Sequence, residues 1–260
     1  MTVGITANLT DDLLMAMDAV AFARAAGIEP DDWQSAVLRS SAPRLLLNVT
    51  RQGGKSTITA ALAAHTALFR PGSLTLIVSP SQRQSAETFA KMIAVYRAVG
   101  RPVPAEAESV LALRLTNGSR VVALPGSEST LRGYSGVALL ILDEAARILD
   151  DLYYSLRPML AVSGGRLIAM STPAGRRGWW FREWAEGGPA FARVEVPATQ
   201  CPRISPQFLA EEEKALGARW YRQEYLCQFS ETSEQIFAYD MLMRAVTSDV
   251  TPLFGGSPNG

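Results

Sequence analysis

The apolar residues of this chain gather in short runs that alternate with longer amphipathic stretches. Mostly apolar runs at 45–50, 74–79, 137–142 and 166–171 predict strands that are buried on both faces. A further run at 191–196 is the last strand candidate. Because helical patterns fill the intervals, the sequence predicts an α/β fold with a mostly parallel central sheet flanked by helices.

The amphipathic stretches define the predicted helices, and Gly and Pro residues mark where they stop. We expect helices at 10–27, from the loop after the first strand to about Phe69, at 82–99, near 150–160, near 177–187 and from about 205 to 229. Segments 110–115 and 120–124 flank Asn117-Gly118, a strong β-hairpin signal. The sheet is therefore expected to include an antiparallel pair.

Composition limits the classes of function. A chain of 260 residues holds one large domain, or one domain with a small appendage. A net charge of zero argues against a generally basic DNA-coating protein, although it allows a local basic patch. Two cysteines and one histidine predict neither a disulfide framework nor a zinc site. No stretch resembles a membrane span or a signal peptide, so we expect a cytosolic protein without a membrane partner.

A glycine-rich turn follows the first strand. It consists of Gln52, Gly53, Gly54, Lys55, Ser56 and Thr57. Backbone N–H groups of such a loop bind phosphate oxygens, while Lys55 would reach the terminal phosphates and the Ser56 hydroxyl would ligate Mg²⁺. The usual pattern has a glycine five positions before Gly54, where this chain has Val49. The alternative is a plain glycine turn between a strand and a helix. A second apolar run that ends in two acidic residues favours the phosphate loop over this alternative.

The apolar run 137–142 ends in an acidic pair, Asp143-Glu144. Asp143 would hold Mg²⁺ through water, and Glu144 would act as the general base that polarises an attacking water. Acidic pairs after strands are also ordinary helix N-terminal charges. Together with the phosphate loop, the pair predicts Mg²⁺-dependent ATP hydrolysis.

Two arginines and two hydroxyls complete the candidate site. Arg51 lies inside the loop and Arg132 lies shortly before the acidic strand, so either could neutralise charge on the transferring phosphoryl group. For Arg132 a loop salt bridge is an equal alternative. Ser171 and Thr172 follow a strand expected to lie beside the acidic one, where they would sense the terminal phosphate or form a capping turn.

A Trp33-Gln34 pair precedes the first strand of the core. The Gln34 amide could read the adenine edge with both a donor and an acceptor. The spacing alone favours the other interpretation, in which Trp33 packs in the core and Gln34 is solvated.

These motifs together resemble the large terminase subunit of tailed bacteriophages. The matching strings are Pro30-Asp31-Asp32-Trp33-Gln34, Thr50 to Thr57, Leu131-Arg132-Gly133, Ile141 to Ala146, Ser171-Thr172-Pro173 and Glu224-Tyr225-Leu226-Cys227-Gln228-Phe229. The likeness spans about residues 30 to 237. In this family the phosphate loop has an Arg-Gln-x-Gly-Lys-Ser form, which explains the missing first glycine. A more acidic residue is common in the family where Gln228 stands.

The resemblance implies an ATPase of the additional-strand, catalytic-glutamate P-loop type that drives double-stranded DNA into a procapsid. It implies that Gln34 reads adenine, that Arg51 is a sensor and that Arg132 is a finger reaching a neighbouring subunit. It implies that Ser171 and Thr172 couple hydrolysis to movement. The implied partners are the portal protein, the small terminase subunit and further copies in a ring, expected to be a pentamer during packaging and a monomer in isolation, in the host cytoplasm.

The expected organisation is an ATPase core with an N-terminal helical, adenine-binding segment at 1–196, a small lid at 197–237 and a linker or tail at 238–260. Family members usually continue into a nuclease domain with clustered acidic metal ligands. This chain has no such cluster in its sequence, so we expect no DNA cleavage.

Other functions compete with packaging. The nearest alternative is a helicase-like or repair-type P-loop ATPase that remodels nucleic acid. A small-molecule phosphotransferase and a non-catalytic nucleotide-binding scaffold are further alternatives. Glu144 suits water activation better than transfer to a sugar, and intact Lys55, Asp143 and Glu144 argue against a scaffold.

Overall fold

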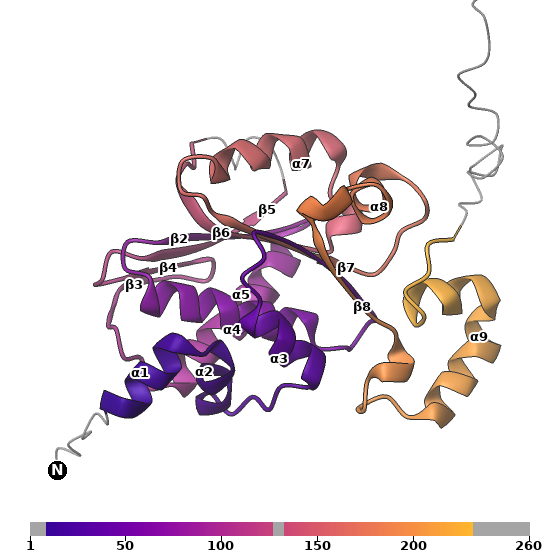
Figure 1. The fold of residues 1–260 in the computed structure, drawn as a ribbon, viewed down its shortest axis with the longest axis horizontal. Helices are drawn as coiled ribbons and strands as arrows, with labels where there is room; N and C mark the ends of the chain where they lie inside the picture. Colours follow the sequence, from indigo (N-terminus) through magenta and orange to yellow (C-terminus); the bar gives the residue numbers. More distant parts are fainter. Residues whose placement is uncertain (1–8, 127–132, 231–260) are drawn as a thin grey trace, which may run out of the picture.

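The fold is a single eight-stranded sheet with helices on both faces (Figure 1), seen in a computed structural model that describes residues 9–126 and 133–230. The strand order is β3-β4-β5-β2-β6-β7-β1-β8. The strands are β1 Arg44–Val49, β2 Leu74–Ser79, β3 Ala105–Glu108, β4 Ala112–Leu115, β5 Arg120–Pro125, β6 Val137–Asp143, β7 Arg166–Ser171 and β8 Ala192–Val196. The pairs from β5 to β8 are parallel, while β3, β4 and β5 pair antiparallel. The predicted α/β fold with a mostly parallel sheet is therefore confirmed.

Most of the helices form two layers around the sheet. The helices are α1 Leu9–Met17, α2 Ala19–Ala25, α3 Asp32–Arg39, α4 Lys55–Phe69, α5 Gln82–Ala98, α7 Asp150–Leu156, α8 Gly178–Ala185 and α9 Pro206–Glu224, with short 3₁₀ turns at Ala145–Arg147, Arg157–Leu160, Gly188–Ala190 and Ala198–Gln200. Figure 1 shows α1 to α5 on one face and α7 and α8 on the other. No helix in the described ranges is long and apolar enough to cross a membrane.

The apolar runs of the sequence become strands with two buried faces, as predicted. Along β1, Leu45 and Leu47 join the core beneath α2 to α5, whereas Leu46 joins the core beneath α7 and α8. The same alternation divides Ile141 from Leu140 in β6. Successive strand residues point to opposite faces, so an unbroken apolar run serves both cores.

Helix α3 was not predicted, and the structure differs from the predicted elements in three further places. The helix expected at 10–27 is two helices, because Asp18 ends the first and caps the second by accepting a hydrogen bond from the Val20 N–H at 3.0 Å. Strand β3 was not predicted, since its Ala-Glu-Ala-Glu sequence carries no apolar run. The last helix ends at Glu224 rather than near 229, and Gly217 interrupts it with a φ of 74°.

A third apolar cluster lies beyond the sheet, in the segment after β8. Ala198, Leu209 and Tyr221 are its buried members. A separate cluster is what a small lid needs, so the proposed division at 196/197 stays a prediction that this packing favours. Residues 231–260, including the predicted tail, lie outside the described residues.

Candidate functional site

The glycine-rich turn connects β1 to α4 at the carboxyl edge of the sheet. Gly54 precedes α4 with a φ of 90°, and a Cβ on it would stand 2.5 Å from Gln34 Nε2. A Cβ on Gly53 would stand 2.6 Å from Val49 Cγ1. Both positions therefore require glycine. Val49 is fully buried in the core, so the residue that departs from the usual pattern serves packing.

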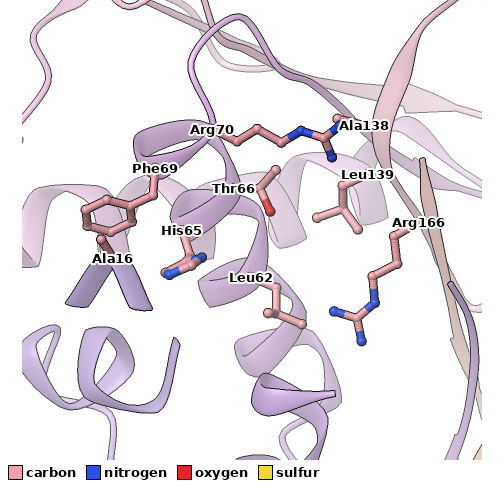
Figure 2. Close-up of a pocket in the computed structure, with 9 residues that line it drawn as sticks. All are labelled: Ala16, Leu62, His65, Thr66, Phe69, Arg70, Ala138, Leu139 and Arg166. Carbon is pink, nitrogen blue, oxygen red and sulfur yellow. The ribbon is translucent and has the colours of Figure 1, made fainter. Parts of the chain in front are cut away.

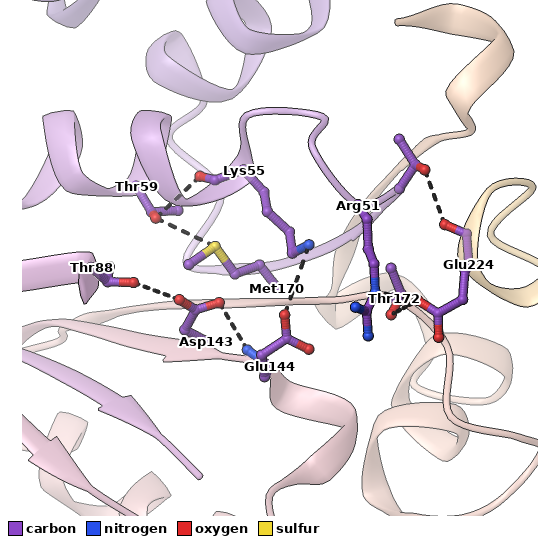
Figure 3. Close-up of polar contacts among 10 residues, drawn as sticks. Arg51, Lys55, Thr59, Thr88, Asp143, Glu144, Met170, Thr172 and Glu224 are labelled. Atoms are coloured by element: carbon purple, nitrogen blue, oxygen red, sulfur yellow. Dashed lines mark hydrogen bonds and ion pairs between the residues drawn. The ribbon is translucent and has the colours of Figure 1, made fainter. Parts of the chain in front are cut away.

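Lys55, Asp143 and Glu144 meet at the end of this turn (Figure 3). Lys55 Nζ lies 4.0 Å from Glu144 Oε1, and the lysine side chain is only 9% exposed. Asp143 Oδ2 accepts a 2.6 Å hydrogen bond from Thr88 Oγ1, and Asp143 Oδ1 accepts one from the Glu144 N–H at 2.9 Å. A buried lysine and two carboxylates thus come from two elements that are about ninety residues apart in the sequence.

Glu144 has an unusual backbone conformation. Its φ of 51° and ψ of 44° lie in the left-handed region, which costs a non-glycine residue about 1–3 kcal/mol. This conformation ends β6 abruptly, and Figure 3 shows the Glu144 carboxylate turned towards the Lys55 ammonium. Strain of this kind gathers at functional sites, where the surrounding structure holds it.

The end of α9 contacts the phosphate loop through Glu224. The Glu224 carboxylate is 10% exposed, pairs with Arg51 Nε at 2.6 Å and accepts a hydrogen bond from Thr172 Oγ1 at 3.4 Å. The Glu224 carbonyl accepts another from Thr50 Oγ1 at 3.0 Å. One residue of the predicted lid therefore joins the loop to the residues that follow β7 (Figure 3).

The Gln34 amide contacts the same loop from α3. Gln34 Oε1 accepts from the Asp31 N–H at 2.9 Å, and Nε2 donates to the Gly53 carbonyl at 3.4 Å. Gln34 is buried, so the interpretation of it as solvated is wrong, whereas Trp33 packs against the core as that interpretation expected. Adenine reading by Trp33 and Gln34 stays a prediction.

Ser171 and Thr172 differ in their hydrogen bonds. Strand β7 does lie beside β6, with Asp143 opposite Met170, as expected. The Ser171 hydroxyl is buried and has no hydrogen-bond partner among the residues that the structure describes, whereas Thr172 contacts Glu224. Arg132 lies outside the described residues.

Three residues make contacts in this site that could not be predicted from the sequence. Thr88 of α5 holds Asp143, and Glu224 holds Arg51. Arg203 donates to Asp31 Oδ1 at 2.8 Å and to the Gly53 carbonyl at 3.1 Å. Glu224 belongs to the Glu-Tyr-x-Cys string, which matched the family pattern but gave Glu224 no predicted role. Thr88 and Arg203 belong to no motif.

A cavity of about 840 Å³ opens over the loop. Its lining consists of Arg51, Gln52, Gly54, Lys55, Ser56, Thr57, Gln84, Glu87, Lys91, Glu144, Arg147 and Arg203. A second cavity of about 500 Å³ shares Arg51, Gln52 and Arg203 with it and extends along Ile204, Phe208 and Tyr225. The first space is polar and rich in cations and the second is bordered by aromatic rings, a division that suits the phosphates and the base of a nucleotide.

The Cys227 thiol, from the distinctive terminal string, is not a nucleophile. It is buried, donates to the Val196 carbonyl at 3.4 Å, and burial raises the pKa of Cys227 to about 12. The Cys227 carbonyl accepts from Asn48 Nδ2 at 2.8 Å. This string therefore fastens the chain after α9 to β1 and β8.

Comparison with known proteins gives one consistent family. A family model described as the terminase large subunit, T4-like virus type, N-terminal, matches residues 46–244. The terminase large subunit of Thermus virus P23-45 is 27% identical over 254 residues, covering 84% of this chain and 52% of that protein. The chain thus spans about half the length of the curated relatives it matches.

Solved structures of large terminases have the same fold. The large terminase ATPase domain of Thermus phage P74-26 has a TM-score of 0.71 and 25% identity, covering 80% of this chain and 97% of that one. A large terminase from a thermophilic bacteriophage, solved in complex with ATP-gamma-S, has a TM-score of 0.65 at 12% identity, covering 76% of this chain and 52% of that one, a likeness of fold alone.

Proposed function

Because this chain belongs to the terminase large subunit family, as its N-terminal ATPase domain, we propose that it hydrolyses ATP with Mg²⁺ and thereby moves double-stranded DNA into a procapsid. The observation that carries the proposal is the meeting of Lys55, Asp143 and strained Glu144 beneath a cation-rich cavity. The ATP-gamma-S complex of the thermophilic phage terminase supports the choice of nucleotide.

The residues present fit a magnesium nucleotide. The turn has glycines where a side chain would collide, and Lys55 and Ser56 border the cavity. Within the described residues, no group of three His, Cys, Asp or Glu side chains could hold a metal by itself. Mg²⁺ bound to a nucleotide takes only one or two protein ligands besides phosphate oxygens and water, so Ser56 and Asp143 would suffice. The ion supplies charge neutralisation on the phosphates.

Lys55 and Glu144 would divide the chemistry between them. Without phosphates the lysine lies 4.0 Å from the glutamate. A triphosphate would offer Lys55 a stronger partner, which leaves the Glu144 carboxylate free to accept a proton from the attacking water. Thr88 would keep Asp143 oriented towards the metal, as outer hydrogen bonds do for other ligands.

Arg51 and Arg132 would stabilise the developing charge, with Arg132 reaching the site of a neighbouring copy in a ring. Arg51 would have to leave Glu224 in order to do so, and that exchange would change what Thr172 and α9 contact. On this proposal Glu224, Ser171 and Thr172 carry the signal from hydrolysis to the lid at 197–237. Trp33 and Gln34 would lie behind the adenine base.

The proposed partners are double-stranded DNA, the portal and procapsid, the small terminase subunit and further copies of the large subunit, in the host cytoplasm. A helicase-like or repair-type remodelling ATPase is the competing proposal. The two differ in what stimulates them: a helicase responds to DNA alone and unwinds forks, whereas a packaging motor needs its portal-bound ring.

The test measures phosphate release from ATP with Mg²⁺, with a chelator, with forked DNA and with portal-bearing procapsids. We expect slow release with Mg²⁺ alone, none with the chelator, no unwinding, and strong stimulation on procapsids. Release that persists in the chelator, or unwinding of forks, would refute the proposal. Incubation with plasmid and manganese is expected to leave the plasmid uncut.

A further inference from the structure

We propose that the opposite, amino edge of the sheet holds a second site, which binds a small carboxylate in a pocket between the end of α4 and the starts of β6 and β7 (Figure 2). The pocket has a volume of about 260 Å³. It shares no lining residue with the cavities over the phosphate loop, so the inference does not depend on ATP hydrolysis.

Arg166, the first residue of β7, is the main reason. Its Nε donates to the Ala42 carbonyl at 3.0 Å, but its Nη2 is buried and has no hydrogen-bond partner among residues 9–126 and 133–230. Burial lowers the pKa of Arg166, and no neighbouring carboxylate in the described part of the chain offsets this effect. A buried guanidinium nitrogen without a counter-charge is costly, and such groups in native proteins normally meet an ion or a water.

A second cation faces the same pocket. Arg70 follows α4, and Figure 2 shows its guanidinium and that of Arg166 on either side of Leu139. Arg70 forms no ion pair within the described ranges. It is not needed to satisfy the last carbonyls of α4 either, because Asn117 Nδ2 donates to the Ala67 carbonyl at 2.9 Å.

His65 does not add a third charge. It lies across the pocket from the arginines, and its Nε2 is 3.0 Å from the Met15 carbonyl. Burial lowers the pKa of His65, so the ring is neutral at pH 7 and donates to that carbonyl. The polar groups that line the pocket besides His65 are therefore the Thr66 hydroxyl and two guanidinium groups, one on each side of Leu139.

The walls and the size select the ligand. Leu62, Phe69, Ala138 and Leu139 supply an apolar lining. A volume of about 260 Å³ is smaller than the sites of drug-sized ligands, which excludes a nucleotide. Guanidinium groups bind carboxylates through paired hydrogen bonds, and apolar walls favour a short hydrocarbon stem. The fitting ligand is a small monocarboxylate, either free or as an acidic side chain of a partner protein.

The carboxylate site and the nucleotide site are connected by the elements that they share. Helix α4 begins at Lys55 and ends beside Arg70, β6 runs from Val137 to Asp143, and β7 starts at Arg166. Three elements thus have one end at each site. A ligand at the amino edge would be held by the same elements that position the phosphate loop and its acidic pair.

The experiment titrates propanoate against sodium chloride at equal ionic strength and follows the unfolding temperature and the methyl NMR signals of Leu62, Leu139 and Ala138. We expect saturable binding with a Kd of about 1–10 mM, which chloride does not reproduce. Equal responses to both salts, or tighter binding of phosphate than of propanoate, would overturn the proposal.

Variants make the assignment specific. Arg166→Met should weaken propanoate binding at least roughly tenfold, because it removes the partly buried charge that would meet the carboxylate. It also removes the Nε hydrogen bond to the Ala42 carbonyl, so the unfolding temperature of the free variant is measured to check its folding. Arg70→Gln, at an exposed position, should weaken binding by a similar factor and keeps the test informative if Arg166→Met misfolds. Arg83→Gln, which loses only an exposed pair with Glu87, is the control and should bind normally. Unchanged binding by Arg166→Met and Arg70→Gln would contradict the site.

A capped glutamate, N-acetylglutamate amide, separates the two sources of the carboxylate. Binding of capped glutamate as tight as that of propanoate indicates an acidic side chain of a partner protein. Binding of propanoate alone indicates a free acid.

Discussion

The charged residues at the two edges of the sheet are arranged in opposite ways. At the carboxyl edge, cations face carboxylates within the chain: Lys55 faces Glu144, Arg51 pairs with Glu224 and Arg203 with Asp31. At the amino edge, Arg166 buries its Nη2 without a carboxylate. The first arrangement can exchange partners when phosphates bind, whereas the described part of the chain offers that Arg166 nitrogen no partner. A search for binding sites should therefore include ion pairs that border a cavity, and not only buried charges without a partner.

The largest effect on nucleotide binding is expected from Lys55→Ala. Loss of the one buried ammonium in the loop should weaken ATP binding roughly 100-fold, since a charged hydrogen bond of about 1.5–3 kcal/mol is lost. Binding of a fluorescent ATP analogue measures it. Lys91→Ala is the control, because Lys91 borders the same cavity but is exposed. Equal losses in both variants would mean that the cavity attracts phosphate by general charge alone.

Thr88→Val tests whether support behind Asp143 matters. Because Thr88 acts through one hydrogen bond at 2.6 Å, the Mg²⁺ concentration for half-maximal hydrolysis should rise about tenfold. A magnesium titration of phosphate release measures it. Thr75→Val is the matched control: Thr75 is fully buried, but its hydroxyl has no hydrogen-bond partner within the described ranges. A shift in the control as large as in Thr88→Val would assign the effect to packing.

Glu224→Gln should have the smallest effect. It keeps the shape of the side chain but removes the charge that holds Arg51, whose own side chain is 59% exposed. We expect the free energy of unfolding to fall by about 1 kcal/mol, measured by urea denaturation. Glu211→Gln, on the exposed side of α9, is the control and should leave the urea midpoint unchanged. If both variants unfold alike, the contact between α9 and the loop contributes nothing to stability.

The sequence predicted the parts of the fold that rest on local pattern. Unbroken apolar runs such as 137–142 indicated strands with two buried faces, and Gly53-Gly54 after such a run indicated a close turn, and the structure has both. The break at Asp18 was missed because the residues around it keep helical spacing, while the capping hydrogen bond to Val20 decides the boundary. Strand β3 was missed because it is exposed and its pairing with β4 decides its structure.

The candidate site was predictable only as far as motifs reach. Lys55, Asp143 and Glu144 stood in recognisable strings, and the structure brings them together. Thr88 and Arg203 could not be found, since each contacts its partner across 55 and 172 residues of sequence without a motif of its own. The unpaired state of Arg166 was likewise invisible, because only the packing shows which charges lack partners.

Phosphate release by Glu144→Gln tests the central claim most directly. The substitution keeps the size of the side chain and removes the carboxylate that would accept a proton from water. We expect hydrolysis in Mg²⁺ to fall by about 10²–10⁴-fold while ATP affinity stays within a few-fold of the unaltered chain. Phosphate release at an undiminished rate would contradict the assignment of Glu144 as the general base and, with it, the account of this edge of the sheet as an ATPase site.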